Sequence, residues 1–138
     1  MNNDKLFRIE LSVRDYECDL QGIVNNAVYL NYFEHARHEF LRAVGVDFNE
    51  LHDDGTDPVV RRIEVNYKRP LTSGDRFYVE LKPERKGRLQ FIFRQHIVRI
   101  DSSVLMASAD VYAVFINQGR PILPPEKIVV AMEQWSDS

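Results

Sequence analysis

Hydrophobic and polar residues alternate along residues 6–13, a pattern that predicts a first β-strand with one face in contact with solvent. The apolar face carries Phe7, Ile9, Leu11 and Val13. The opposite face is mostly polar, and the strand leads the chain into a turn around Asp19.

The period changes between residues 27 and 44, where apolar side chains recur at alternating steps of four and three. These side chains are Tyr29, Phe33, Ala36, Phe40 and Ala43. Polar residues lie largely away from this stripe, so the segment is predicted to be one amphipathic helix. Gly45 stands where a left-handed residue ends many helices, and we expect it to close this one.

Most of the remaining chain reads as strands joined by tight turns. After a short helical segment over residues 47–55, strands are predicted over residues 59–67, 77–81, 89–97 and 104–116. The run 104–116 is apolar on almost both faces, which indicates a strand deep in the sheet or at a subunit contact. Three prolines then break the pattern at 121, 124 and 125, before a short helix expected at 126–132.

This order of elements predicts an α+β fold with an antiparallel sheet. One long helix is expected to pack on a sheet of about five strands. Residues 1–138 are expected to form one domain, because a chain of this length buries roughly two thirds of its unfolded surface.

Composition narrows the function classes. A net charge of −3 argues against a dedicated nucleic-acid binder. A single cysteine, Cys18, excludes an internal disulfide. The first residues lack the pattern of a signal peptide, and no apolar run approaches the ~20 residues of a membrane span. We therefore expect a cytoplasmic protein.

The candidate chemistry lies between Asp19 and the start of the long helix. Asp19 precedes a turn that contains Gly22, and Asn25 and Asn26 open the helix. Unpaired N–H groups at a helix N-terminus can stabilise a carbonyl oxygen that gains negative charge. A neighbouring carboxylate can attack that carbonyl or activate a water molecule.

At these residues the chain resembles hotdog-fold acyl-CoA thioesterases of the 4-hydroxybenzoyl-CoA thioesterase type. The family pattern is an Asp, a short turn with a Gly, and a helix reading roughly N-x-x-Y-L-x-x-x-E-x-A-R. It is matched by Asp19, Gly22, Asn26, Tyr29, Leu30, Glu34, Ala36 and Arg37. Weaker matches continue through Tyr67, Pro70, Gly74 and Asp75 to Gly119, Arg120, Pro121 and Pro124.

The resemblance implies a hotdog fold in which Asp19 is the nucleophile or base and the N–H of Asn26 holds the oxyanion. Gly22, Asn25 and Tyr29 are then expected to contact substrate. Two alternatives remain open from the residues alone: Asp19 as an ordinary loop carboxylate, and either Asn25 or Asn26 as a helix cap. Family members often have an aromatic residue or a His where this chain has two Asn residues, and the Asn pair is more similar to single-hotdog plant acyl-ACP thioesterases.

Neither a metal nor another cofactor is expected. His35, His38 and Glu39 form H-x-x-H-E, which differs from the zinc-binding spacing H-E-x-x-H and is more typical of a solvated helix face. Glu34 and Arg37, spaced i, i+3, are expected to fix the helix rather than touch substrate.

A phosphorylated thiol carrier would require local basic groups, because the chain as a whole is acidic. They concentrate at Lys68-Arg69, at Arg120 and in a predicted hairpin with Arg85, Lys86 and Arg88. We predict that these three hairpin residues bind the carrier, although solvated turn charges are an equally simple interpretation.

The sequence thus favours an acyl-CoA thioester hydrolase that acts on an acyl-CoA or an acyl carrier protein thioester. The alternatives are a non-catalytic acyl-thioester binding module and a hotdog hydratase or dehydratase, whose sites usually combine a His with an acidic partner. Uncovered apolar surface predicts a homo-oligomer, a dimer or a dimer of dimers (homotetramer). The hotdog resemblance implies that the sheet curls around the long helix and that two such sheets pair into one, with sites at the subunit boundary.

Overall fold

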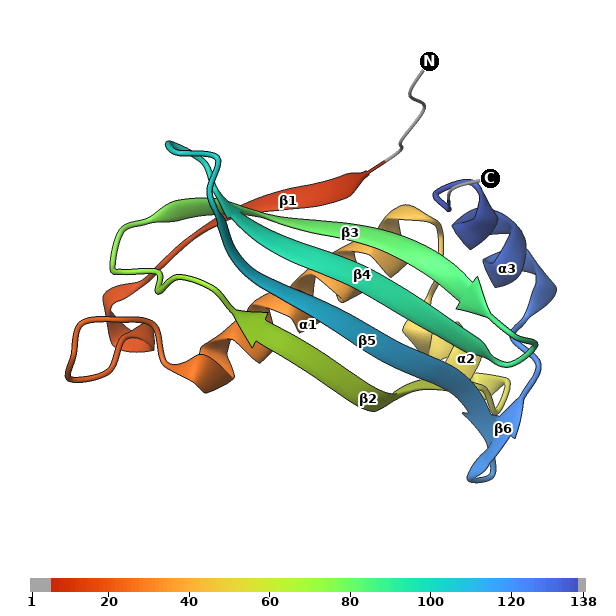
Figure 1. The fold of residues 1–138 in the computed structure, drawn as a ribbon. Helices are drawn as coiled ribbons and strands as arrows, with labels where there is room; N and C mark the ends of the chain where they lie inside the picture. Colours follow the sequence, from red (N-terminus) through yellow and green to blue (C-terminus); the bar gives the residue numbers. More distant parts are fainter. Residues whose placement is uncertain (1–5, 137–138) are drawn as a thin grey trace, which may run out of the picture.

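An antiparallel sheet curves around one long helix, α1 (Asn26–Ala43), in the computed structural model, which describes residues 6–136 (Figure 1). The strands are β1 (Phe7–Ser12), β2 (Asp57–Tyr67), β3 (Arg76–Lys86), β4 (Gln90–Arg99), β5 (Leu105–Asn117) and β6 (Arg120–Ile122). The shorter helices are a 3-10 turn (Asp15–Glu17), α2 (Phe48–Asp53) and α3 (Glu126–Glu133). The predicted hotdog architecture is confirmed.

The strand order is β1-β3-β4-β5-β2, and β6 pairs with the end of β5. The prediction did not include β6, whose residues were interpreted as a break caused by the prolines. Pro121 lies within it opposite Ile116. A three-residue strand is too short to show an alternating pattern, and proline is tolerated where no ladder N–H is needed.

The hydrophobic core lies between α1 and the concave face of the sheet. Phe33, Ala36 and Phe40 are almost fully buried, as the helical period predicts, and they meet Phe77 and Val79 in one apolar cluster. Ala43 is exposed, so its predicted place in the stripe is wrong. The buried stripe instead broadens to include Tyr32, Arg37 and Leu41, as expected for a helix that packs on a curved sheet.

Both ends of α1 are capped by local sequence. The Oδ1 atom of Asn25 accepts the N–H of Ala27 at 2.9 Å. Gly45 has a φ of +88°, its N–H donates to the Arg42 carbonyl at 3.1 Å, and Val46 N–H donates to the Leu41 carbonyl at 2.9 Å. This Schellman motif confirms the predicted role of Gly45.

Arg37 fixes α1 to the sheet rather than to its own helix. Its Nη1 donates to Oε1 of Gln95 on β4 at 3.1 Å, and Gln95 Nε2 donates to the carbonyl of Phe33 at 3.0 Å. No ion pair with Glu34 forms within residues 6–136. Burial of the guanidinium lowers the pKa of Arg37, and Gln95 partly replaces the water it has lost.

β5 lies inside the sheet between β4 and β2, which explains why both of its faces are apolar. β2 and β1 are the two edges of the sheet, and among residues 6–136 no strand pairs with the outer side of β2. β2 also exposes large apolar side chains, Val60, Ile63 and Tyr67, whereas β5 exposes Leu105 at its start. The uncovered apolar surface of the sheet therefore lies mainly on β2.

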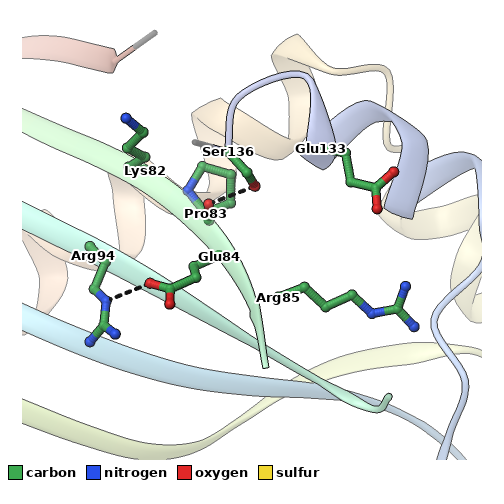
Figure 2. Close-up of a pocket in the computed structure, with 7 residues that line it drawn as sticks. All are labelled: Lys82, Pro83, Glu84, Arg85, Arg94, Glu133 and Ser136. Atoms are coloured by element: carbon green, nitrogen blue, oxygen red, sulfur yellow. Dashed lines mark hydrogen bonds and ion pairs between the residues drawn. The ribbon is translucent and has the colours of Figure 1, made fainter. Parts of the chain in front are cut away.

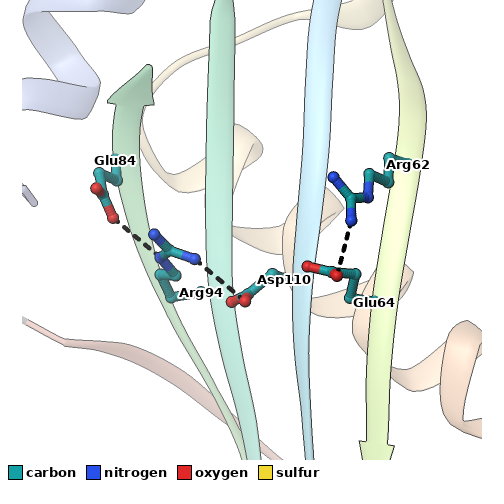
Figure 3. Close-up of polar contacts among 5 residues, drawn as sticks. All are labelled: Arg62, Glu64, Glu84, Arg94 and Asp110. Atoms are coloured by element: carbon teal, nitrogen blue, oxygen red, sulfur yellow. Dashed lines mark hydrogen bonds and ion pairs between the residues drawn. The ribbon is translucent and has the colours of Figure 1, made fainter.

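The convex face of the sheet carries paired charges (Figure 3). Arg94 bridges Glu84 at 2.9 Å and Asp110 at 3.1 Å, and Arg62 pairs with Glu64 at 2.8 Å on the edge strand. The helices lie on the other side of the sheet in this view. Each helix in the described part of the chain is too short or too polar to cross a membrane.

Candidate active site

The turn that holds Asp19 is defined by backbone hydrogen bonds. The Asp19 N–H donates to the Ile23 carbonyl at 2.9 Å, and the Gly22 N–H donates to the Asp19 carbonyl at 3.0 Å. Gly22 has a φ of +80°, a left-handed conformation. A Cβ atom there would meet no other atom of the chain within 4 Å. The backbone angle therefore accounts for glycine at this position.

A second loop holds this turn against the start of α1. Val24 N–H donates to the Leu71 carbonyl at 2.9 Å, and Ile23 forms a β-bridge with Thr72. The Leu71 N–H in turn donates to the Tyr29 hydroxyl at 3.0 Å. The positions of Asp19 and the helix N-terminus are thus fixed relative to each other through residues 71 and 72.

A pocket of about 340 Å³ opens between these segments. Its lining residues are Asp19, Ile23, Val24, Asn26, Tyr29, Tyr67, Lys68, Arg69 and Pro70. Three of the predicted site residues, Asp19, Asn26 and Tyr29, are therefore brought together. Gly22 and Asn25 flank the pocket as turn and cap.

The Asp19 carboxylate is exposed to water at this pocket. Its Oδ1 accepts the backbone N–H of Gln21 at 3.0 Å, and the Gln21 side-chain amide, turned to donate, adds a bond of 2.9 Å. Both contacts come from Gln21, two residues further along the same turn, and they hold the carboxylate at the pocket. An aspartate in this setting can accept a proton from water or attack a carbonyl carbon.

Asn25 and Asn26 have different structural roles. Asn25 caps α1 through its side chain, as the alternative interpretation anticipated. Its carbonyl also accepts the Val28 N–H at 2.9 Å. The Asn26 N–H, at the first helical position, finds no acceptor within residues 6–136. An unpaired N–H with the helix dipole behind it can stabilise an oxyanion in the pocket.

Tyr29 and Tyr67 form an aromatic wall of the pocket. Their rings meet edge to face with centroids 5.2 Å apart. Burial raises the pKa of Tyr29, so its hydroxyl stays neutral, and its oxygen accepts the Leu71 N–H. The Tyr67 hydroxyl donates to the Asn26 carbonyl at 3.0 Å. Tyr67 belongs to the weaker part of the family pattern, and its place on β2 could not be connected to Asp19 before the sheet was known.

The basic hairpin between β3 and β4 lies at the other end of the sheet (Figure 1). The Asp19 turn contacts the loop before β3, whereas Arg85, Lys86 and Arg88 lie where β3 ends. An 11-residue strand separates them, a length of roughly 35 Å. In the hairpin, Arg85 Nη2 donates to the Arg88 carbonyl at 2.8 Å, and Lys86 Nζ lies 5.3 Å from the Tyr112 ring centroid. Within one chain, the basic residues at the pocket are Lys68 and Arg69.

A larger pocket of about 580 Å³ lies between β3, β4 and α3 (Figure 2). Ser136 Oγ donates to the Pro83 carbonyl at 2.9 Å, and Arg94 is occupied by Glu84 at 2.9 Å. Two of its polar contacts are thus made within the pocket, while Arg85 donates to the Arg88 carbonyl in the hairpin. The larger pocket offers neither a helix N-terminus nor a carboxylate next to an unpaired donor, so the Asp19 pocket is the better candidate.

The H-x-x-H-E pattern lies on the outer side of α1, where His35 and His38 are exposed. The His38 ring packs on Phe48 of α2 with centroids 5.3 Å apart. Within the described residues, no three His, Cys, Asp or Glu side chains gather in a group that could hold a metal ion. No histidine lines the Asp19 pocket.

Comparison with known proteins identifies the family of the chain. Residues 13–132 match the family described as the thioesterase-like superfamily. The chain is 36% identical over 121 residues to the acyl-acyl carrier protein thioesterase ATL3, chloroplastic, of Arabidopsis thaliana, covering 87% of this chain and 64% of the relative. It is 28% identical to the acyl-CoA thioester hydrolase YbgC of Escherichia coli O6:H1, covering 96% and 99%.

Solved structures show the same architecture. The crystal structure of a hypothetical protein from Aquifex aeolicus superposes with a TM-score of 0.84 at 31% identity, covering 91% of this chain and 98% of that one. The chain spans just under two thirds of the length of the Arabidopsis relatives it matches. Because the family match extends over most of the chain, this protein belongs to the thioesterase-like superfamily of hotdog proteins.

Proposed function

We propose that the protein hydrolyses acyl thioesters of coenzyme A or of an acyl carrier protein in the Asp19 pocket. One observation carries the proposal: an exposed carboxylate and an unpaired helix N-terminal N–H line the same pocket. Membership of the superfamily supports the reaction class. The relatives' names divide between the two carriers, one naming acyl carrier protein and one acyl-CoA, so both are candidate substrates.

In the proposed reaction the thioester oxygen accepts the Asn26 N–H while Asp19 acts as a general base. Asp19 takes a proton from water as the water oxygen bonds to the carbonyl carbon, and negative charge develops on the carbonyl oxygen. The C–S bond then breaks and its electron pair leaves with sulfur. The proton held by Asp19 passes to the thiolate, and the acid and the free thiol are the products.

The same geometry suits Asp19 as a nucleophile. Its carboxylate oxygen would bond to the carbonyl carbon, the thiolate would leave, and water would hydrolyse the resulting anhydride. Gly22 shapes the turn, Asn25 holds the helix start and Tyr29 forms a wall against the acyl thioester. Each of the three would contribute to substrate binding by shaping the pocket.

For the phosphorylated carrier we propose Lys68 and Arg69, which line the pocket itself. Arg85, Lys86 and Arg88 are a second candidate. Because these residues lie at the far end of the sheet, they could bind the carrier at an Asp19 pocket only if a neighbouring subunit placed its hairpin beside that pocket. Such an arrangement follows from the proposed homo-oligomer, a dimer or dimer of dimers with sites at the boundary.

The two alternatives are separable on structural grounds. A hydratase of this fold would need a histidine near the acidic residue, and none lines the pocket. A carboxylate buried against an acyl group would be costly in a pure binding module, but Asp19 is exposed in the single chain, so this cost does not argue against a binding module. Only turnover separates binder from hydrolase.

The test is a panel of acyl-CoA, acyl-acyl carrier protein and enoyl-CoA thioesters incubated with the protein. We expect release of free thiol from at least one acyl thioester and no hydration of the enoyl double bond. Binding of acyl thioesters without thiol release would make the protein a binding module. Hydration without thiol release would make it a hydratase.

A further inference from the structure

We propose that Tyr67 is a positioning residue that fixes the direction of the Asn26 N–H, a role that rests on the proposed function. Tyr67 ends the edge strand β2, and Asn26 begins α1. The Tyr67 hydroxyl donates to the Asn26 carbonyl at 3.0 Å across 41 residues of sequence. This contact ties the start of the helix directly to the sheet.

The two peptide planes on either side of the Asn26 Cα are both held by hydrogen bonds. The plane between residues 25 and 26 is held by the Val28 N–H, which donates to the Asn25 carbonyl at 2.9 Å. The plane between residues 26 and 27 is held at both ends. Ala27 N–H donates to Asn25 Oδ1 at 2.9 Å, and the Asn26 carbonyl accepts the Tyr67 hydroxyl. The Asn26 N–H alone lacks an acceptor within residues 6–136.

The Tyr67 ring is held in place by packing, which fixes the position of its hydroxyl. It packs edge to face on Tyr29, whose own hydroxyl accepts the Leu71 N–H at 3.0 Å. Leu71 also accepts the Val24 N–H through its carbonyl at 2.9 Å, so the chain of contacts continues to the Asp19 turn. Tyr67 therefore connects the donor of the proposed oxyanion site to the segment that holds the carboxylate.

The Tyr67 hydroxyl is dispensable for helix formation. In an α-helix a carbonyl accepts the N–H four residues later, so the Asn26 carbonyl has a helical partner in Leu30 as well. The side chain is also half exposed, at 49%. Removing only the hydroxyl should therefore leave the fold intact and loosen the orientation of the first helical residue.

The test compares Tyr67→Phe with Tyr78→Phe in steady-state hydrolysis of an acyl thioester that the wild type turns over. Tyr67→Phe keeps the ring on Tyr29 and should lower kcat by roughly 3- to 10-fold with KM unchanged, the effect of one hydrogen bond felt only in the transition state. Tyr78 lies on the convex face under Arg8 and should have no effect. Tyr67→Ala also removes the ring and should lower kcat further.

Nitrogen-15 relaxation of the Asn26 amide gives a readout that requires no turnover. We expect a lower order parameter at residue 26 in Tyr67→Phe, with Tyr78→Phe unchanged and both variants melting like the wild type. An unchanged kcat and an unchanged order parameter would overturn the proposal, as would a higher KM at constant kcat, which would indicate substrate contact instead. If the wild type hydrolyses no thioester, the proposed function fails, whereas relaxation still decides whether Tyr67 positions Asn26.

Discussion

Lys68 and Arg69 have no carboxylate partner among residues 6–136, whereas several other basic residues do. Ion pairs engage the arginines at positions 8, 14, 42, 62, 76, 94 and 99. The backbone N–H groups of Lys68 and Arg69 both donate to the Met106 carbonyl, at 2.8 and 3.0 Å. Their backbone is thus fixed at the pocket while their charges remain available to an anion.

Replacing both residues by glutamine should weaken binding of a phosphorylated carrier. For Lys68→Gln/Arg69→Gln we expect KM for acyl-CoA at low salt to rise roughly 3- to 10-fold, the effect of losing two exposed charges, with kcat nearly unchanged. Hydrolysis of the corresponding acyl-pantetheine, which has no phosphate, should be unaffected. Steady-state kinetics with both substrates measures this.

The control is the triple hairpin variant Arg85→Gln/Lys86→Gln/Arg88→Gln. A higher KM for acyl-CoA in this variant alone would place the phosphates on the hairpin and refute the assignment to Lys68 and Arg69. A higher KM in both variants would indicate that two subunits share one carrier site.

Local sequence made Asp19, Gly22 and Asn26 predictable as a group, because all three lie within the eight residues 19–26 of the turn and helix start. A left-handed glycine and a helix cap are both short-range features. Tyr67 and Lys68 reach the same pocket only through strand pairing, more than 40 residues along the chain. The sequence named Tyr67 in the weaker part of the family pattern and Lys68 in one of three basic clusters, but no local pattern placed either beside Asp19; that placement came from the structure.

Helices and strands with a strong hydrophobic period were predicted well, but the pairing between strands was not. The helix at 26–43 and the long strands follow from alternation and helical spacing. The doubly apolar run in β5 correctly indicated an inner strand, but most of the exposed large apolar side chains of the sheet lie on β2. An edge strand and an inner strand differ in which neighbour they pair with, and the sequence of one strand does not specify its neighbours.

The hairpin at 85–88 illustrates the same limit. Its charges are evident in the sequence, but their distance from Asp19 depends on which end of β3 meets the Asp19 turn. Because adjacent strands run antiparallel, successive turns fall at opposite ends of the sheet. The turn at 73–75 therefore adjoins the Asp19 segment, and the next turn lies at the far end.

At the scale of the whole molecule, the outer side of β2 is uncovered in the described part of the single chain. β2 presents unpaired backbone groups along its outer side together with exposed Val60, Ile63 and Tyr67. An edge strand of this kind invites pairing with another chain. The pocket that holds Asp19 borders the end of this strand, so an assembly through β2 would place its sites at the subunit boundary.

Light scattering tests this assembly. We expect a mass that is a multiple of 16.2 kDa, and we expect Ile63→Lys on the β2 edge to lower both the mass and the activity. A charge there would oppose an apolar contact between subunits. Leu123→Lys, at an exposed leucine away from β2, should change neither. A monomer that stays fully active on dilution would contradict the assembly and the shared site.

The most direct test of the account is thiol release from an acyl thioester by Asp19 variants. Asp19→Asn preserves an acceptor for the Gln21 N–H, and Asp19→Ala removes it; both should fold like the wild type because the side chain is exposed in a turn. Loss of the base or nucleophile should lower the rate by at least ~10² in both. Asp53→Asn, at an exposed carboxylate on α2, is the matched control and should retain full activity. Near wild-type thiol release by both Asp19 variants would contradict the proposal that this carboxylate performs the hydrolysis.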